Sequence, residues 1–76
     1  MISKKRFHTI NELQKVQQLA INCPCEVAFH SPDYSVMVDA KSYIGMYALD
    51  FSKPIYVVSE DVEFHAQIKN LGENIE

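Results

Sequence analysis

Ser42 is the residue whose neighbours best fit a defined chemistry. Apolar and polar residues alternate over 36–40, which predicts a half-buried strand, and the spacing then becomes helical over 41–49. Ser42 stands where the predicted helix needs its N-cap, and its hydroxyl can accept from the free N–H groups of the first turn. A phosphoryl group there would meet the same N–H groups and the positive end of the helix dipole. N-capping alone would also explain a serine at this position.

The three histidines differ in their predicted positions. His8 lies inside the first predicted strand, close to the start of the first predicted helix. His30 lies at a predicted hairpin turn and His65 on the last predicted helix. Neither has an arginine or a helix N-terminus beside it, so we expect surface or boundary positions for both.

Cys23 and Cys25 flank a proline. Residues this close cannot easily form an unstrained disulfide, and a redox motif would space them one residue further apart. The pair could be combined with His8 or His30 into a metal site, but structural zinc normally has four ligands. We therefore expect reduced cysteines at a helix-to-strand junction and no metal.

The length and the net charge of the chain limit how many domains it can form and which partners it is expected to bind. The 76 residues have room for one domain, over 1–76, and the net charge of −3 lacks the basic excess typical of nucleic-acid binding. No apolar run is long enough to cross a membrane, and the basic start is not followed by the apolar core of a signal peptide. We expect a cytoplasmic protein that binds neither nucleic acid nor membrane.

The patterns along the chain predict four strands and three helices in the order β-α-β-β-α-β-α. Helix one is expected to begin with a capping box at Thr9 and Glu12, with Asn11 as a competing cap, and to end before Pro24. Helix three is expected to end at Gly72, with a frayed tail after it. The predicted strands cover 4–10, 25–30, 34–40 and 55–58, and the helices begin near 11, 41 and 61. The implied fold is α/β (α+β): an open-faced β-sandwich of four mainly antiparallel strands covered on one face by three helices.

The amphipathic spacing of the helices also predicts which side chains are buried. In the first helix the predicted buried positions are Leu13, Val16, Leu19 and Ala20, and the predicted water-facing positions are Gln14, Lys15, Gln17 and Gln18. In the last helix the predicted buried positions are Phe64, Ile68 and Leu71, and His65 is a further candidate for this stripe. The strand Ile55 to Val58 is β-branched and aromatic enough to lie in the centre of the sheet.

Five residues form a motif around the serine: Val38, Lys41, Ser42, Gly45 and Leu49. Their pattern, Val-x-x-Lys-Ser-x-x-Gly-x-x-x-Leu, resembles the strand-to-helix segment of HPr, the phosphocarrier protein of the bacterial sugar phosphotransferase system. HPr also has the element order predicted above, so the resemblance extends over nearly the whole chain. In that family the serine is the regulatory phosphorylation site, and the resemblance implies the same role here.

The resemblance also implies a partner-binding surface. The short predicted helix cannot turn Tyr43, Ile44 and Tyr47 all inward, so apolar surface should remain beside Ser42. These three residues match the apolar docking patch of HPr. Lys41 and Gly45 complete the implied binding surface, Gly45 as the position of close backbone approach.

The catalytic motif of HPr is missing from this chain. A phosphocarrier of this family has Gly-x-His-Ala-Arg-Pro before its first helix, whereas this chain has Phe-His-Thr-Ile-Asn-Glu-Leu over 7–13. The catalytic position falls near Thr9 and the arginine position near Asn11, and Glu12 places a carboxylate where a phosphoryl anion needs positive charge. His8 is near this position but lies inside the predicted strand.

The leading prediction is a non-catalytic HPr-like regulatory or binding protein of the sugar phosphotransferase or carbon-catabolite system, without a cofactor. Its expected partners are proteins, such as HPr kinase/phosphorylase or a carbon-catabolite transcription regulator. Some paralogues of HPr lack the active histidine and act in this way. One alternative is a histidine phosphocarrier that uses His8. The other is a plain interaction domain without phosphorylation, for example a homodimer through its open sheet face.

Overall fold

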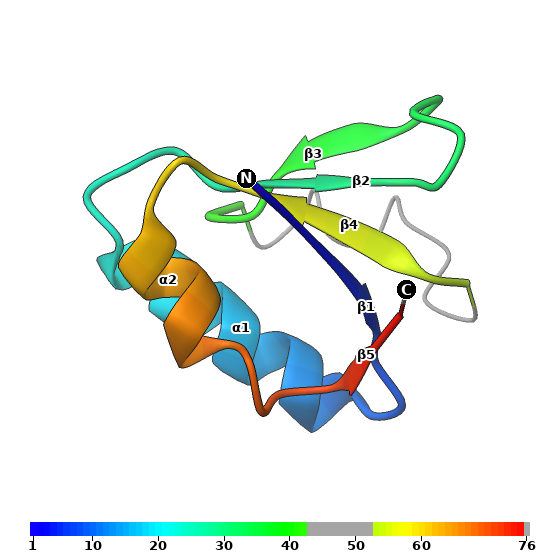
Figure 1. Cartoon of the computed structure of the whole chain (residues 1–76), viewed down its shortest axis with the longest axis horizontal. Coiled ribbons are helices and arrows are strands. Elements are labelled where there is room, and N and C mark those ends of the chain that lie inside the picture. Colours follow the sequence, from blue (N-terminus) through cyan, green and yellow to red (C-terminus); the bar gives the residue numbers. More distant parts are fainter. Residues whose placement is uncertain (43–52, 76) are drawn as a thin grey trace.

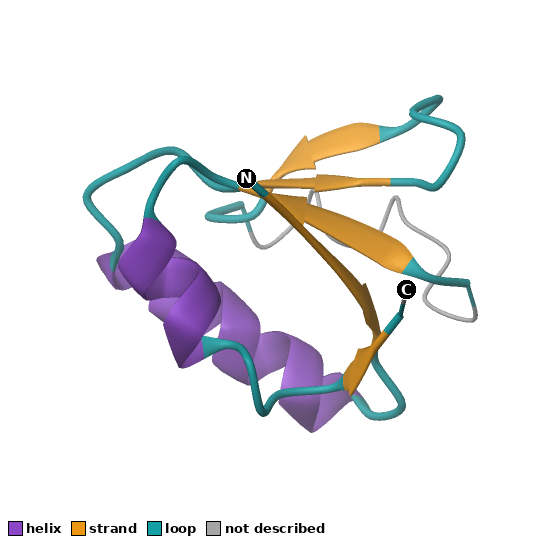
Figure 2. Cartoon of the chain, viewed as in Figure 1, coloured by secondary structure: helices purple, strands orange, loops and turns teal. Residues whose placement is uncertain are grey.

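The protein is an α+β domain, described by a computed structural model over residues 1–42 and 53–75. Five strands and two helices lie in these residues: β1 Ile2–Arg6, α1 Ile10–Asn22, β2 Ala28–His30, β3 Met37–Asp39, β4 Ile55–Val58, α2 Val62–Gln67 and β5 Glu73–Asn74. Figures 1 and 2 show α1 and α2 side by side, with the sheet on one side of them. The general α/β class is confirmed. No helix in the described residues is long and apolar enough to cross a membrane.

The sheet has the strand order β3-β2-β4-β1-β5, and every pairing is antiparallel. The predicted central position of Ile55–Val58 is confirmed, because β4 pairs with both β1 and β2. Along β4, Ile55 and Val57 are buried, and Tyr56 and Val58 are half-buried on the other face. Residues two apart on a strand share a face, so this alternation separates an inner face, under the helices, from an outer face.

The number of strands was predicted wrongly. The tail expected to fray contains β5, whose Glu73 and Asn74 pair with Arg6 and Lys5 of β1. Gly72 does not end the last helix, since α2 ends at Gln67. Instead Gly72, with a φ of 70°, turns the chain into β5. Glycine adopts this left-handed conformation without the steric cost that a Cβ adds.

The first helix follows the prediction closely. Thr9 is the N-cap, and its side chain and that of Glu12 form the predicted capping box. The buried side chains are those of Leu13, Val16, Gln17 and Ala20, at the i, i+3, i+4, i+7 spacing of one helix face, while Leu19 is half-buried. The water-facing prediction for Gln17 was wrong, because Gln17 lies on the same helix face as the apolar residues.

Several other predicted elements differ in extent or lie outside the described residues. The strands predicted over 25–30 and 34–40 are shorter, as β2 and β3. The first strand covers 2–6 and not 4–10, so residues 7–9 form the loop before α1. The predicted helix over 41–49 falls mostly on residues 43–52, outside the described part, and its first two residues, Lys41 and Ser42, are not helical. The count of three helices is therefore not matched within the described residues, where there are two.

The hydrophobic core lies between the inner face of the sheet and the two helices. Its buried members are Phe7, Leu13, Val16, Ala20, Cys23, Val27, Phe29, Ala40, Ile55, Val57, Phe64 and Ile68. The predicted burial of Phe64 and Ile68 is confirmed, and Leu71 packs against the core while partly exposed. Val36 and Val38 also pack against it, while Met37 and Asp39 are exposed, so the predicted alternation along this strand is confirmed.

Candidate functional site

The N-terminal turn of α1 is the position that a phosphocarrier would use, and a carboxylate of this chain already occupies it. Glu12 Oε1 accepts hydrogen bonds from the backbone N–H groups of His8, at 2.8 Å, and Thr9, at 3.2 Å. Its Oε2 accepts from Gly72 N–H at 3.1 Å. These bonds, that from His8 foremost, lower the pKa of Glu12 from its ordinary value. The start of α1, where a phosphoryl anion on His8 would lie, thus already holds an anion of the protein itself.

The His8 ring is exposed and faces acidic groups. Its side chain is 60% exposed, and Nε2 lies 3.6 Å from a carboxylate oxygen of Glu73 on β5. His8 is in the loop before α1, so its placement inside a strand was wrong. A phosphoryl group on this ring would lie near Glu73 and, along the backbone, Glu12. Like charges at such distances repel.

Lys41 and Ser42 follow directly after β3 and are held by a tight turn. The side chain of Asp39 accepts from Lys41 N–H at 2.9 Å, and its backbone carbonyl accepts from Ser42 N–H at 3.0 Å. Lys41 Nζ donates to the carbonyl of Cys23 at 2.9 Å, which joins this turn to the end of α1. Both residues are half-buried.

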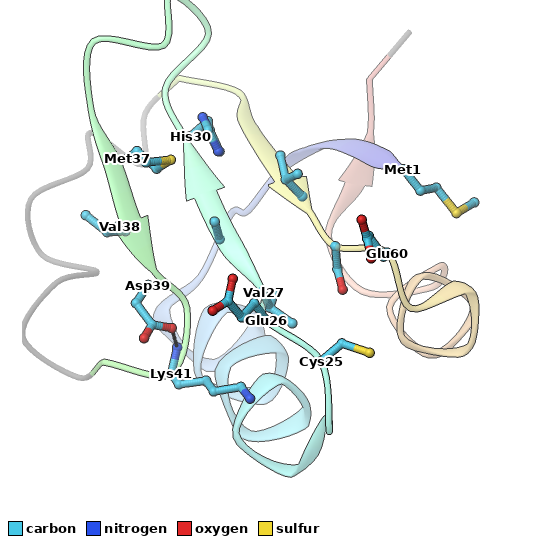
Figure 3. Close-up of a pocket in the computed structure, with 13 residues that line it drawn as sticks. Met1, Cys25, Glu26, Val27, His30, Met37, Val38, Asp39, Lys41 and Glu60 are labelled. Atoms are coloured by element: carbon cyan, nitrogen blue, oxygen red, sulfur yellow. Dashed lines mark hydrogen bonds between the residues drawn. The ribbon is translucent and has the colours of Figure 1, made fainter.

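The remaining residues of the predicted surface, Tyr43, Ile44, Gly45 and Tyr47, lie outside the described residues. What can be described is the surface next to Lys41. There an open groove of about 880 Å³ crosses the ends of β2, β3 and β4 (Figure 3). Its lining includes apolar side chains and three carboxylates. The charged residues of the lining are Glu26, Asp39, Lys41 and Glu60. A groove of this composition can receive an apolar segment and bind it with charged groups at its rim.

The two cysteines are free, and their environments differ. Cys23 is buried, and its thiol donates to Asp61 Oδ2 at 3.1 Å, while Cys25 is exposed. Burial, and after it the hydrogen bond to Asp61, raises the pKa of the Cys23 thiol. The same hydrogen bond is the first cause that lowers the pKa of Asp61. Since Asp61 is the N-cap of α2, the thiol connects the end of α1 to the start of α2.

Of the two positions considered for His65, the buried stripe of the last helix is confirmed, and the surface or boundary position was wrong. His65 is 5% exposed; its Nε2 lies 2.9 Å from the Ser59 carbonyl and its Nδ1 2.6 Å from Ser3 Oγ. A carbonyl only accepts, so Nε2 carries the proton and the Ser3 hydroxyl donates to Nδ1. His65 thus links Ser3 in β1 to the backbone of Ser59, the residue after β4. His30 is half-buried, as a boundary residue would be.

Lys5 is a buried cation that the sequence patterns did not single out. It is 1% exposed, and its Nζ donates to the carbonyls of Ile68 at 2.6 Å, Lys69 at 3.1 Å and Leu71 at 2.9 Å. Burial lowers its pKa. An ammonium group has three donors, and all three are used here. The signal was the alternation of β1, which places Lys5 on the same face as Phe7.

Within the described residues, no three His, Cys, Asp or Glu side chains are grouped so that they could hold a metal ion. Comparisons with protein-family models, with curated proteins and with solved structures found no match to this chain. The resemblance to HPr therefore rests on the motif over 38–49 and on the order of the elements, and what it implies stays a prediction.

Proposed function

We propose that this chain is a non-catalytic regulatory protein of the HPr type, which binds protein partners through the segment that begins at Lys41 and Ser42. The observation that supports this proposal most is the position of Glu12. Its carboxylate accepts from the N–H groups of His8, Thr9 and Gly72, and so places a negative charge beside the position that a phosphoryl group on His8 would take. Transfer through His8 would require that carboxylate to leave or to be protonated.

The repulsion between a phosphoryl group on His8 and the nearby carboxylates can be estimated. Two unit charges 4 Å apart interact by about 1 kcal/mol in water and by about 4 kcal/mol near a protein surface. Glu12 and Glu73 would therefore oppose a phosphoryl group at His8 by an energy of that order. A phosphocarrier needs the opposite sign, with a cation and free N–H groups stabilising the anion.

The turn at Ser42 offers more favourable surroundings for added negative charge. Lys41 Nζ donates to a neutral carbonyl, that of Cys23, and a phosphate oxygen is a stronger acceptor for the same ammonium group. A phosphoryl group on Ser42 would also repel the carboxylate of Asp39, which holds the turn. Phosphorylation would therefore change both the charge and the shape of the groove beside Lys41, and with them the choice of partner.

Phosphorylation at Ser42 tests this proposal. The purified chain is incubated with ATP and an HPr kinase/phosphorylase, and the modified residue is located by peptide mass spectrometry. We expect one phosphoserine at Ser42, which is absent in Ser42→Ala and kept in Ser35→Ala, a control at an exposed serine of the loop between β2 and β3. An unmodified Ser42 would contradict the regulatory role.

A second arm examines the phosphocarrier alternative. The chain is incubated with phosphoenolpyruvate and enzyme I of the phosphotransferase system. We expect no acid-labile phosphohistidine. A phosphohistidine that disappears in His8→Ala would show instead that the chain carries phosphate.

A further inference from the structure

The outer face of the sheet presents apolar side chains that the helices do not cover. In the antiparallel register one row across the sheet is Met37, His30, Tyr56 and Lys4, and the next is Asp39, Ala28, Val58 and Ile2. Met37 is 66% exposed and Ile2 47% exposed. The close-up in Figure 3 shows Met37 and His30 on neighbouring strands. Between Met37 and Ile2 lie the half-buried side chains of β2 and β4, and apolar side chains exposed on a sheet face can mark an interaction site.

Tyr34 extends this face from the loop between β2 and β3. Its φ of 60° lies in the left-handed region, which is rare for a bulky residue and costs of order 1–3 kcal/mol. The side chain of Asp33 accepts from the Ser31 and Ser35 hydroxyls, each at 2.7 Å, and from Ser35 N–H at 3.0 Å, which fixes the loop. The Tyr34 ring, half exposed, stands edge-on to the rings of His30 and Tyr56, with centroids 5.1 and 5.7 Å away. The hydrogen bonds of Asp33 thus hold Tyr34 in this left-handed conformation, which places its ring at the outer face.

The charges of these two rows lie at opposite sides of the face. Lys4 belongs to β1 and is exposed, with its ammonium nitrogen 5.3 Å from the centre of the Tyr56 ring. Asp39 belongs to β3 and is also exposed. Between these strands lie β2 and β4, whose residues in the two rows are His30, Ala28, Tyr56 and Val58. The face therefore has an apolar centre, a cation on one side and an anion on the other.

We propose that the outer face packs against the same face of a second copy of this chain. A two-fold axis that lies in the interface and runs roughly along the strands places β1 of one copy over β3 of the other. Lys4 of each copy then faces Asp39 of its partner, within about 7 Å along the strand, a step of two residues that a lysine side chain can span. The charge pattern is thus complementary to itself, whereas a uniformly charged face would be repelled by its own copy.

The small total surface of the chain limits how much area such an interface can bury. A tenth of the chain's 4747 Å² surface, the usual share of an interface, is about 470 Å² per copy or about 950 Å² for the pair. This lies below the size of standard stable interfaces, so the dimer should be weak and in rapid exchange with the monomer. Concentration-dependent association is the expected behaviour.

Sedimentation velocity on the full chain, from about 20 µM to about 1 mM, tests the proposal over the range where a small interface associates. We expect the weight-average mass to rise from one copy towards two. Lys4→Glu and Asp39→Lys, each alone, should weaken association by at least about tenfold, because each places like charges opposite one another twice per dimer. Mixing the two variants should restore association, since every facing pair is then of opposite sign.

Lys15→Glu is the matched control, because Lys15 is exposed on α1, away from the outer face. It should leave association unchanged although its change in net charge equals that of Lys4→Glu. A chain that stays monomeric to the highest concentration overturns the proposal, even where it binds a different protein. Three other results would also overturn it: association that neither Lys4→Glu nor Asp39→Lys weakens, association that Lys15→Glu weakens as much as they do, and a mixture of the two variants that does not associate. The last result would show that the variants act by disturbing the fold.

Discussion

Replacing Lys5 by methionine should remove a large part of the stability of this domain. The substitution keeps the apolar stem but takes away the ammonium group that binds the carbonyls of Ile68, Lys69 and Leu71. Two of these carbonyls keep another donor: Ile68 O accepts from Leu71 N–H, and Lys69 O accepts from the Asn74 side chain. Leu71 O is left without one among the described residues.

The magnitude follows from that count. A hydrogen bond to a charged group contributes about 1.5–3 kcal/mol, and a typical bond whose acceptor keeps another partner counts at the low end, about 0.5 kcal/mol. The bond to Leu71 O counts as one to a charged group, and the bonds to Ile68 O and Lys69 O count at about 0.5 kcal/mol each, which gives a loss of about 3 kcal/mol. The total stability expected for 76 residues is about 4–11 kcal/mol. The melting temperature should therefore fall by about 12–24 °C.

The assay is thermal and urea unfolding followed by circular dichroism, with Lys4→Met as the matched control. Lys4 is the exposed neighbour of Lys5 on the opposite face, and its contact with the Tyr56 ring should contribute less than about 1 kcal/mol. If Lys5→Met unfolds at the same temperature as Lys4→Met, the ammonium group does not hold the segment after α2, and the reasoning is refuted.

Three further results are expected. Gly72→Ala should lower stability by about 2–3 kcal/mol in urea unfolding, because the new Cβ would lie 2.8 Å from Phe7 Cδ1 at a φ of 70°; an unchanged midpoint would refute this. Glu12→Gln should be less stable than the parent chain at neutral pH, because the lowered pKa of Glu12 means that its carboxylate stabilises the fold above the ordinary pKa of 4.5. This difference in stability should vanish as the pH falls through the lower pKa of the folded state. A difference that persists in acid would contradict this. Iodoacetamide should alkylate Cys25 in the native protein and Cys23 only after unfolding, because burial and the raised pKa leave little thiolate at Cys23; equal rates by mass spectrometry would show that Cys23 is accessible.

Local patterns predicted the elements whose signals lie within a few residues of one another. The capping box at Thr9 and Glu12 and the strand Ile55–Val58 were found in this way, since both depend on side chains that are neighbours in the sequence. The alternation around Val38 likewise gave the correct inner and outer faces of β3.

The features that escaped prediction depend on contacts between distant parts of the chain. Lys5 is buried because its ammonium group donates to carbonyls more than 60 residues later in the chain, and no local sequence pattern indicates such acceptors. β5 forms because Glu73 and Asn74 meet the free edge of β1, although two polar residues near a terminus carry no strand signal. His65 is buried for the same reason, through its contact with Ser3.

The candidate site shows the same division. Glu12, at the start of the first predicted helix, already argued against a phosphoryl group on His8. The sequence could not show that the carboxylate also binds Gly72 N–H and so ties β5 to α1. The partner surface over 43–47 lies outside the described residues, so Lys41 and Ser42 are the two of its residues whose surroundings could be described.

The central claim is that this chain receives phosphate on a serine for regulation and does not pass it on from a histidine. The most direct measurement is a ³¹P NMR spectrum at neutral pH after incubation with both donor systems, ATP with the kinase and phosphoenolpyruvate with enzyme I. We expect a single phosphoserine resonance that is lost in Ser42→Ala. A phosphohistidine resonance, lost in His8→Ala, or a spectrum without any protein-bound phosphate would contradict it.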